Sequence, residues 1–439
     1  MANRIYLCLA HMSEAGLEQK YIQEAFDTNW VAPLGPNVNG FEEDLKAFVG
    51  QGKEVVALTT GTAAVHLSLI ACGVEPGDEV ITQSFTFCAS AHPVTYLGAT
   101  PVFVDSEKET WNMDPDLLEE AIKDRIAKTG KKPKVIMPVA LYGMPYQIDR
   151  ILEIANRYDI PVVEDAAEGF GSRYDGQVLG TFGRYGILSF NGNKMITTSG
   201  GGALICPNKE EGERVMWYAT QARESYPYYQ HETIGYNYRM SNICAGIGRG
   251  QMTIVNEHIA HHQHVHQLYV ELFSKIDGIE VHSQPANGRY ASNYWLTSIT
   301  LDENLKIKGQ ENAYKEIITS PVGGVPAVIH AASSARTDCQ PNDNVEALRM
   351  ALEKAGIESR PLWKPMHKQP VYCRTNEKLG MRNEELSHGI IRQTSATSVA
   401  YVNGVSENIF KKGMCLPAGP WVKDEDVKRI VETIKANII

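Results

Sequence analysis

Between residues 55 and 205, short apolar runs alternate with stretches whose apolar residues recur at helical spacing. Six runs predict strands, at residues 78–87, 99–105, 133–143, 160–171, 185–194 and 201–207. Residues 114–130 and 147–159, which lie between them, predict helices. Alternating strands and helices are typical of a mainly parallel sheet covered by helices on both faces. The pattern therefore predicts an α/β fold, in which ligands bind at the carboxyl ends of the strands.

The pattern changes in the second half of the chain. Residues 243–275 contain no proline and predict one long helical region. From about Gly278, shorter strand and helix patterns predict a smaller α+β unit. We therefore expect a large domain over residues 1–255 and a small C-terminal domain over residues 256–439. Residues 320–343 lack periodicity and indicate a long loop or insertion, to which no role is assigned.

Composition narrows the class of protein. Against 52 Asp and Glu, the 439 residues include 42 Lys and Arg, for a formal net charge of −10. This balance argues against nucleic acid or an anionic membrane as the main partner. The eight cysteines form no C-x-x-C motif, which favours reduced thiols. The start lacks a signal-peptide pattern, and no stretch approaches the ~20 apolar residues of a membrane helix, so we expect a cytoplasmic protein.

Two predicted element ends carry polar groups that suit a ligand. The segment from Thr59 to Thr62 precedes an apolar helical stretch, and a helix start of small residues favours a bound anion. The same segment would also serve as an ordinary N-cap. Glu164 and Asp165 end a predicted strand. A carboxylate there either caps a helix or holds a proton on a heteroaromatic nitrogen.

The segment SFNGNKMITTSGGG, residues 189–202, places Lys194 directly after a predicted strand, among hydroxylated residues and glycines. A lone lysine is usually a solvated charge, but this setting favours a nucleophile with room for a phosphate and a flat ring. Further on, GYNYRMSNICAG at residues 235–246 indicates either a packed loop or a segment that reaches a neighbouring subunit.

Together these segments predict a cofactor that has an aldehyde, a phosphate and a pyridine nitrogen. Pyridoxal phosphate meets all three requirements. In this interpretation Lys194 forms a Schiff base with the aldehyde, Asp165 anchors the ring nitrogen, and the helix start near Gly61 binds the phosphate.

In their order and wording, these motifs resemble the DegT/DnrJ/EryC1/StrS sugar aminotransferases, which are fold type I pyridoxal-phosphate enzymes. The resemblance covers nearly the whole chain, from NWVAPLGPNVNGFE through GTAAVHLSL, EDAAE, SFNGNK and GYNYRMSNI to CLPAGPWVKDEDVKRI. It implies an aspartate-aminotransferase-like large domain with a mainly parallel seven-stranded sheet and a smaller C-terminal α+β domain. It also implies a homodimer with shared active sites.

Carried over residue by residue, the resemblance makes Lys194 and Asp165 the catalytic residues. No metal ligand is implied. The implied cofactor contacts are Lys194 and Asp165 themselves, Phe87 stacked on the ring, Gly61 and Thr62 in the phosphate-binding turn, Ser189 and Asn191 of the SFNGNK motif, Glu168 at the ring hydroxyl, and Asn237 delivered from the partner subunit.

Three positions depart from the family pattern. Glu168 stands where most members have glutamine, residues 198–202 read T-S-G-G-G where many read T-G-E-G-G, and Ala140-Leu141 stand where many have a histidine. The first two resemble the branch that aminates UDP-linked 4-keto-6-deoxy-N-acetylhexosamines, as in bacillosamine synthesis. We therefore expect amino transfer from an amino acid such as glutamate to that class of sugar, for cell-surface glycans. The Glu168 carboxyl is expected to be protonated at the cofactor edge, or else to cap a following helix.

Other functions on the same fold stay open. Related sugar dehydratases carry histidine at the position of Lys194, which argues against dehydration. A non-catalytic regulatory module would not need Lys194 and Asp165 together. An aminotransferase for free amino acids would need an arginine clamp for two carboxylates. Arg223, Arg239 and Arg360 are candidates for binding the donor's carboxylates.

Overall fold

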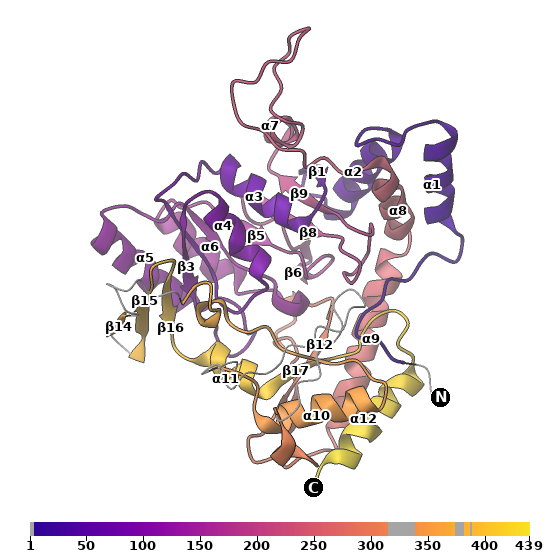
Figure 1. Ribbon diagram of the computed structural model, residues 1–439, viewed down its shortest axis with the longest axis vertical. Coiled ribbons are helices and arrows are strands. Elements are labelled where there is room, and N and C mark those ends of the chain that lie inside the picture. Colours follow the sequence, from indigo (N-terminus) through magenta and orange to yellow (C-terminus); the bar gives the residue numbers. More distant parts are fainter. Residues whose placement is uncertain (1–3, 315–338, 374–381, 387–388) are drawn as a thin grey trace.

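A computed structural model describes residues 4–314, 339–373, 382–386 and 389–439. The described chain forms a large α/β unit and a smaller unit, which lies beneath it in Figure 1 and contains the last helix of the chain. The loop predicted at residues 320–343 lies mostly outside the described residues.

The large unit is built on a sheet that crosses its middle. Four strands follow the order β1-β9-β8-β5, and isolated parallel bridges from Ile136 to Val162 and from Val139 to Asp165 join β5 to β4, β2 and β3. Strand β9 runs antiparallel to its two neighbours, whereas the β5–β8, β4–β2 and β2–β3 pairs are parallel. The predicted seven-stranded, mainly parallel sheet is confirmed. Its strands are β1 (Glu54–Leu58), β2 (Glu79–Gln83), β3 (Thr100–Val104), β4 (Val135–Met137), β5 (Val163–Asp165), β8 (Tyr185–Ser189) and β9 (Gly202–Cys206).

Helices pack on both faces of this sheet, which explains why the strands read as continuous apolar runs. These helices are α3 (Gly61–Ala71), α4 (His92–Tyr96), α5 (Pro115–Thr129), α6 (Ile148–Arg157) and α7 (Lys209–Ala219). Local signals set their ends. The Asp114 side chain caps α5, Pro115 occupies its first turn, and Gly130 ends it in the left-handed conformation.

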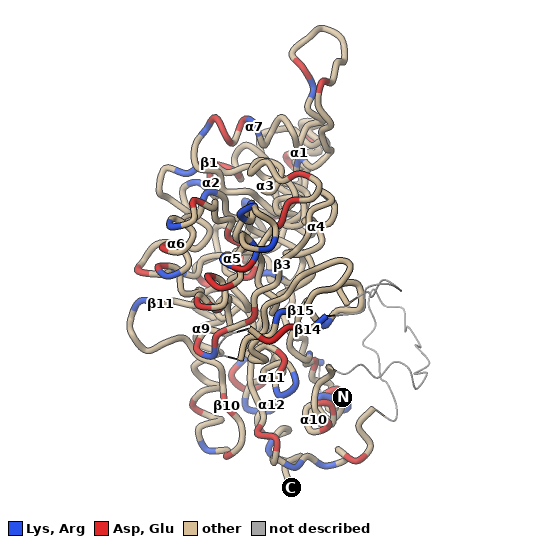
Figure 2. The backbone as a smooth tube through the Cα atoms, turned by 90° about the vertical axis from the view of Figure 1, so that its left-hand side faces the viewer, with Lys and Arg blue, Asp and Glu red and all other residues tan. Residues whose placement is uncertain are grey.

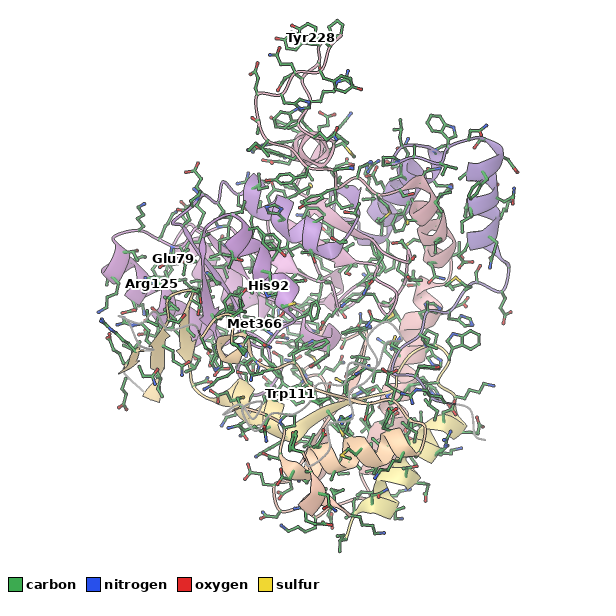
Figure 3. All side chains as sticks on the ribbon, viewed as in Figure 1. Glu79, His92, Trp111, Arg125, Tyr228 and Met366 are labelled. Carbon is green, nitrogen blue, oxygen red and sulfur yellow. The ribbon has the colours of Figure 1, made fainter. Side chains whose placement is uncertain are left out.

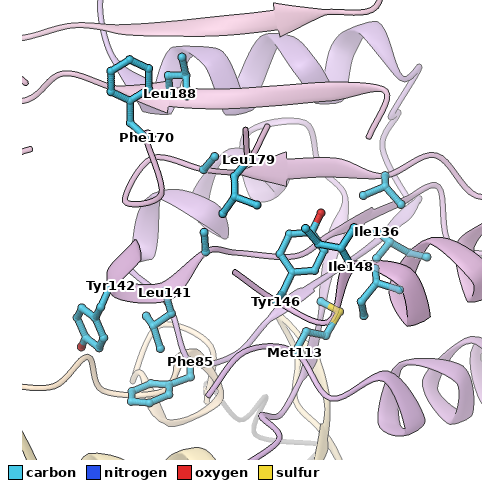
Figure 4. Close-up of a cluster of buried hydrophobic side chains, with 14 of the residues drawn as sticks. Phe85, Met113, Ile136, Leu141, Tyr142, Tyr146, Ile148, Phe170, Leu179 and Leu188 are labelled. Carbon is cyan, nitrogen blue, oxygen red and sulfur yellow. The ribbon is translucent and has the colours of Figure 1, made fainter. Parts of the chain in front are cut away.

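A buried cluster of large side chains fixes the ends of the strands. Figure 4 shows Phe85, Leu141, Tyr146 and Leu188 within it, and these four side chains are at most 1% exposed. Phe85 follows β2 and Leu141 follows β4, so the loops beyond both strands are anchored by their own apolar side chains. Such close packing holds the loops at the carboxyl edge in one arrangement.

The helical region predicted at residues 243–275 is two helices rather than one. α8 (Asn242–Met252) ends before Thr253, and α9 (Val255–Phe273) begins after Ile254, whose backbone is not helical. α8 packs against α1 (Leu17–Asp27) and α2 (Pro36–Val49). A side chain at Gly250 would meet Glu18 at 2.7 Å, so the glycines of α8 permit this close approach. The two helices therefore have different packing partners, since α9 packs against α12 (Asp424–Asn437) of the small unit.

The small unit has its own sheet, in the order β10-β12-β17-β13. α9 leads into it from the large unit, and α10 (Asp343–Lys354) and α12 (Asp424–Asn437) complete its core. Its strands are β10 (Ile279–Val281), β12 (Thr297–Leu301), β13 (Arg360–Pro361) and β17 (Gly413–Leu416).

The chain then returns to the first sheet. Strands β14 (Arg382–Glu385), β15 (Ile391–Thr394) and β16 (Val399–Val402) extend it beyond β3, and β16 pairs in parallel with β3. Part of the segment predicted as small domain thus lies on the large unit's sheet, while the boundary at residue 255 stays a prediction.

An arm at residues 221–235 projects from the large unit beyond α7 (Figure 1), with Tyr228 at its tip in Figure 3. Tyr226, Tyr228, Tyr229 and Ile234 on this arm are exposed, and the first two rings stack at 5.4 Å. Elsewhere acidic and basic side chains are interspersed (Figure 2). None of the helices in the described part of the chain has both the length and the apolar character of a membrane span.

Candidate active site

A cavity of about 900 Å³, including its open mouth, lies at the carboxyl ends of β5 and β8 and is closed on one side by the small unit. Eight of the nine predicted cofactor-binding residues line it, and the ninth, Asn237, does not. Those eight are Gly61, Thr62, Phe87, Asp165, Glu168, Ser189, Asn191 and Lys194. The fold therefore brings together residues from four separate segments.

Lys194 lies in the turn that follows β8, where its backbone N–H donates to the Asn191 carbonyl at 2.9 Å. Its side chain is 14% exposed, and its Nζ lies 3.7 Å from Oε1 of Glu168. The same nitrogen lies 4.0 Å from the ring centre of Trp295. The amine is thus held between a carboxyl and an aromatic face inside the cavity.

Asp165 ends β5 with both carboxyl oxygens engaged. The Ser90 hydroxyl donates to Oδ2 at 2.7 Å, and the Ala167 backbone N–H donates to Oδ1 at 3.1 Å. Burial raises the pKa of Asp165, while these two hydrogen bonds and the Lys194 amine oppose the rise. The chain continues into a turn and β6 (Arg173–Tyr174), so Asp165 has no following helix to cap. Its position suits a partner for a ring nitrogen.

Glu168 also points into the cavity rather than away from it. Its Oε2 accepts a hydrogen bond from the Tyr142 backbone N–H at 2.7 Å. Burial is the largest influence and raises the pKa of Glu168; Lys194 and the Tyr142 N–H oppose it, and Asp165 adds to it. No helix begins directly after Glu168, so the alternative role as a helix cap does not describe its contacts.

The start of α3 forms an anion cradle. The Thr60 hydroxyl accepts from the Ala63 N–H at 2.9 Å, and the first-turn N–H groups of Gly61 and Thr62 have no acceptor within the helix. An added Cβ at Gly202 would lie 2.4 Å from the Gly61 nitrogen, so only glycine lets β9 approach the helix this closely. Ser189 lies on the other side of Gly61, with its Oγ 3.3 Å from where a Cβ at Gly61 would stand. The two N–H groups and the hydroxyl therefore belong to residues that line the same cavity.

Aromatic side chains form the walls near the mouth. Phe87 is 49% exposed, and its ring centre lies 5.3 Å from that of Trp363. Trp363 in turn lies 6.0 Å from Tyr142 in a stacked arrangement. Sequence reasoning missed Trp363, Trp295 and Ser90. The two tryptophans come from the small unit, where a large apolar residue reads as core, and a serine in SFTFCAS carries no spacing signal.

The three arginines proposed for the donor's carboxylates do not line this cavity. Arg239 is buried and forms an ion pair with Glu42. Arg360 pairs with Glu358 at 2.8 Å, and Arg223 lies on the arm, 4.2 Å above the Tyr229 ring. Among the cavity-lining side chains of the described chain, Lys194 is the one cation.

The donor set fits pyridoxal phosphate. The cradle offers N–H and hydroxyl donors to a phosphate, Asp165 offers a carboxyl to a ring nitrogen, and Lys194 offers an amine to an aldehyde. Phe87 stands at the wall with an exposed face that suits a flat ring.

Known proteins share these features. Residues 13–319 match the model of the DegT/DnrJ/EryC1/StrS aminotransferase family. The chain is 40% identical to the pyridoxal phosphate-dependent aminotransferase EpsN of Bacillus subtilis, over 99% of this chain and 96% of that protein. It is 30% identical to a GDP-perosamine synthase of Escherichia coli O157:H7, over 98% of both chains.

A solved structure agrees with the fold. A DegT DnrJ EryC1 StrS aminotransferase from Brucella abortus superposes with a TM-score of 0.76 at 25% identity, covering 96% of this chain and 95% of that one. The predicted cofactor, fold and enzyme class are thereby confirmed. The chain belongs to the DegT/DnrJ/EryC1/StrS aminotransferase family, and it is a pyridoxal phosphate-dependent sugar aminotransferase.

Proposed function

We propose that the protein transfers an amino group from glutamate to a UDP-linked 4-keto-6-deoxy-N-acetylhexosamine, for the synthesis of a cell-surface glycan. The observation that carries amino transfer is the buried Lys194 amine beside Asp165 and the anion cradle in one cavity. The choice of sugar is supported at Gly200, which lines the cavity and whose added Cβ would meet nothing within 4 Å. Where many members have glutamate, this wall is open and uncharged, which leaves room for an N-acetyl group.

Pyridoxal phosphate supplies an electron sink when it is bound. The Asp165 carboxylate keeps a proton on the ring nitrogen, and the Ser90 hydroxyl and Ala167 N–H hold that carboxylate in place. The N–H groups of Gly61 and Thr62, with the Ser189 hydroxyl, bind the phosphate.

Lys194 moves the proton. Its Nζ, when it is free, would take a proton from the carbon that bears the amino group and deliver it to the carbon on the other side of that nitrogen, as a positioned general base and acid does. The small unit covers one side of this amine with the Trp295 ring. The Glu168 carboxyl, 3.7 Å from Nζ, would hold a proton at the edge of the bound cofactor.

The test is amination by the purified protein of a panel of UDP- and GDP-linked 4-keto sugars, with glutamate as donor. We expect turnover with the UDP-linked N-acetyl sugar. Lys194→Ala should lose at least about three orders of magnitude in rate, and the exposed control Lys131→Ala should match wild type. Because the relative at 30% identity is named a GDP-perosamine synthase, preference for a GDP-linked sugar is the second candidate and would overturn the UDP assignment.

We further propose that each active site is completed by a second copy of the chain. Asn237 is exposed and outside its own cavity, and the cavity's single cation cannot balance a phosphate, a nucleotide diphosphate and the donor's carboxylates. The adjoining arm presents exposed aromatic rings and Arg223, which suits contact with another subunit. None of the eight cysteines, all of which lie within the described residues, forms a disulfide, which supports a cytoplasmic location.

A further inference from the structure

Lys194 has an unexplained neighbour. The Trp295 indole comes from the small unit, just before β12, yet its ring faces Nζ of Lys194 at 4.0 Å. Trp295 is 2% exposed, and its indole N–H donates to the backbone carbonyl of Asn193 at 2.6 Å. The residue that precedes Lys194 in the chain is therefore tied directly to the ring that covers its amine.

The position of Trp295 is also fixed through Asn293, whose side chain bonds both to Trp295 and to the large unit. The Trp295 backbone N–H donates to the Asn293 side-chain oxygen at 2.9 Å. The Asn293 amide nitrogen donates to the carbonyls of Glu168 at 3.0 Å and Phe170 at 2.9 Å. Asn293 is fully buried, and a Cβ at Gly143 would lie 1.8 Å from its side-chain oxygen, so only glycine at position 143 leaves room for this amide.

These contacts link three groups into one unit. Asn293 donates a hydrogen bond to the backbone of Glu168, and Trp295 donates one to the backbone of Asn193. The Lys194 amine lies between the Trp295 ring and the Glu168 carboxyl. Buried hydrogen bonds of this kind specify one geometry, because breaking any of them leaves a polar group unsatisfied. A cation over an indole face is also attracted to it.

We propose that Trp295 is a positioning residue, which holds the Lys194 amine, when it is free of the cofactor, in line for proton transfer, with Asn293 as its anchor. This inference rests on the proposed role of Lys194. It makes the small unit part of the proton-transfer machinery: the amine is in place only while the small unit is docked against residues 168–172 and 193.

The first test is Trp295→Phe, which keeps an aromatic face and removes the N–H donor. We expect kcat to fall about ten- to a hundred-fold, because a misplaced reacting group loses that much, while KM for both substrates and cofactor affinity stay within about two-fold of wild type. The matched control is Trp421→Phe. The Trp421 indole also donates to a backbone carbonyl, that of Ala10 at 2.8 Å, but it does not line the cavity. A kcat within two-fold of the control would overturn the proposal.

The second test needs neither catalysis nor cofactor. In the cofactor-free full chain at pH 8, the modification rate of Lys194 by an amine reagent is read by peptide mass spectrometry against exposed Lys131. In Trp295→Leu, which keeps an apolar cover without a π face, Lys194 should react about two- to five-fold faster, since the cation–π attraction is lost. An unchanged or slower rate would overturn the cation–π part.

A reverse measurement leaves Trp295 in place and guards against poorly folded variants. Lys194→Gln should shift the tryptophan emission of the cofactor-free chain, because a charge 4.0 Å from the ring disappears. The exposed control Lys134→Gln should not shift it. No difference between the two would overturn the contact. Failure of the proposed function is distinguishable, because then wild type itself would neither aminate a keto sugar nor be trapped at Lys194 by borohydride.

Discussion

Two buried carboxyls and one amine share the cavity, and they differ in hydrogen bonding. Asp165 accepts from a hydroxyl and a backbone N–H, whereas Glu168 accepts from the Tyr142 backbone N–H. Burial raises the pKa of both, and the charge of Asp165 raises the pKa of Glu168 further. Since a hydroxyl and a backbone N–H stabilise the Asp165 carboxylate, we expect Asp165 to be the carboxyl that ionises and Glu168 to be the one that keeps the proton.

Replacing Glu168 tests this division. Glu168→Gln keeps an acceptor for the Tyr142 N–H, so activity at the pH optimum should stay within about ten-fold of wild type. The pH dependence of the cofactor's absorption band should shift, because one titrating group is gone. Asp165→Asn is the contrasting variant and should lose several orders of magnitude in rate. An unchanged spectral titration in Glu168→Gln would leave Glu168 as a structural residue.

The same variant has a stability signature. Because the folded-state pKa of Glu168 lies above the ordinary value of 4.5, its stabilising, protonated form is fully present below that pH and is lost as pH rises through the folded pKa. The wild type is thus penalised at higher pH, and thermal unfolding should show Glu168→Gln gaining on wild type there.

Local sequence patterns were enough to predict those cavity residues that lie at the ends of strands or helices. Asp165 and Ser189 end strands with apolar runs, Lys194 follows one of these strands, and Gly61 begins a helix, so their meeting at one sheet edge follows from the fold class. Trp295 was not predictable, because its contact with Lys194 depends on how two units dock. No periodicity within either unit reports that docking.

At the scale of elements, helix α9 joins the two units and carries several buried histidines. His258, His262 and His266 each make one hydrogen bond, to the Met195 carbonyl, the Tyr294 carbonyl and the Ser283 hydroxyl. Among the described residues, the second ring nitrogen of each has no partner. Burial lowers the pKa of His262 to about 3 and of His266 to about 4. These rings are neutral in the folded protein.

Acid should therefore weaken α9 before it weakens the sheet. The unfolded chain binds protons to these histidines from about pH 6.5 downward, while the folded chain does not, so each costs about 1.4 kcal/mol of stability per pH unit below that value. His262→Gln should flatten the fall of the unfolding midpoint between pH 7.5 and 5. His264→Gln, an exposed residue of the same helix paired with Asp424, should not. Equal slopes in both variants would contradict this account.

Elements with strong periodicity were predicted well, and weakly patterned ones were not. α5 and α6 formed where expected, because apolar residues recur at helical spacing in both and α5 also has caps at both ends. The break between α8 and α9 was missed, since neither proline nor a charge cluster marks Thr253 and Ile254. The return of β14–β16 to the first sheet was missed too, because β14 is wholly exposed and has no apolar face.

At the scale of the molecule, the shared-site proposal predicts complementation between two inactive chains. Lys194→Ala and Asn237→Ala each inactivate every site of their own homodimers. In a mixed dimer, one site would carry both lesions and the other neither, so activity should return to roughly a quarter of wild type after random exchange.

The control pairs Lys194→Ala with Asp165→Asn, two residues that line the same cavity. Each site of that mixed dimer keeps one lesion, so no activity should return. If the Asn237 mixture also stayed inactive after verified subunit exchange, Asn237 would act within its own chain or not at all.

The pairing of β16 with β3 also determines when the large unit's sheet can be completed during synthesis on the ribosome. Val102 pairs with Val399, about two-thirds of the chain's length further along. At about 5–20 residues per second, β3 emerges roughly 15–60 s before its partner, and meanwhile its outer edge is unpaired. An open edge strand invites pairing with other nascent chains. The large unit therefore completes its sheet only after nearly all of the chain has been translated, and a holding chaperone would have its binding site at β3.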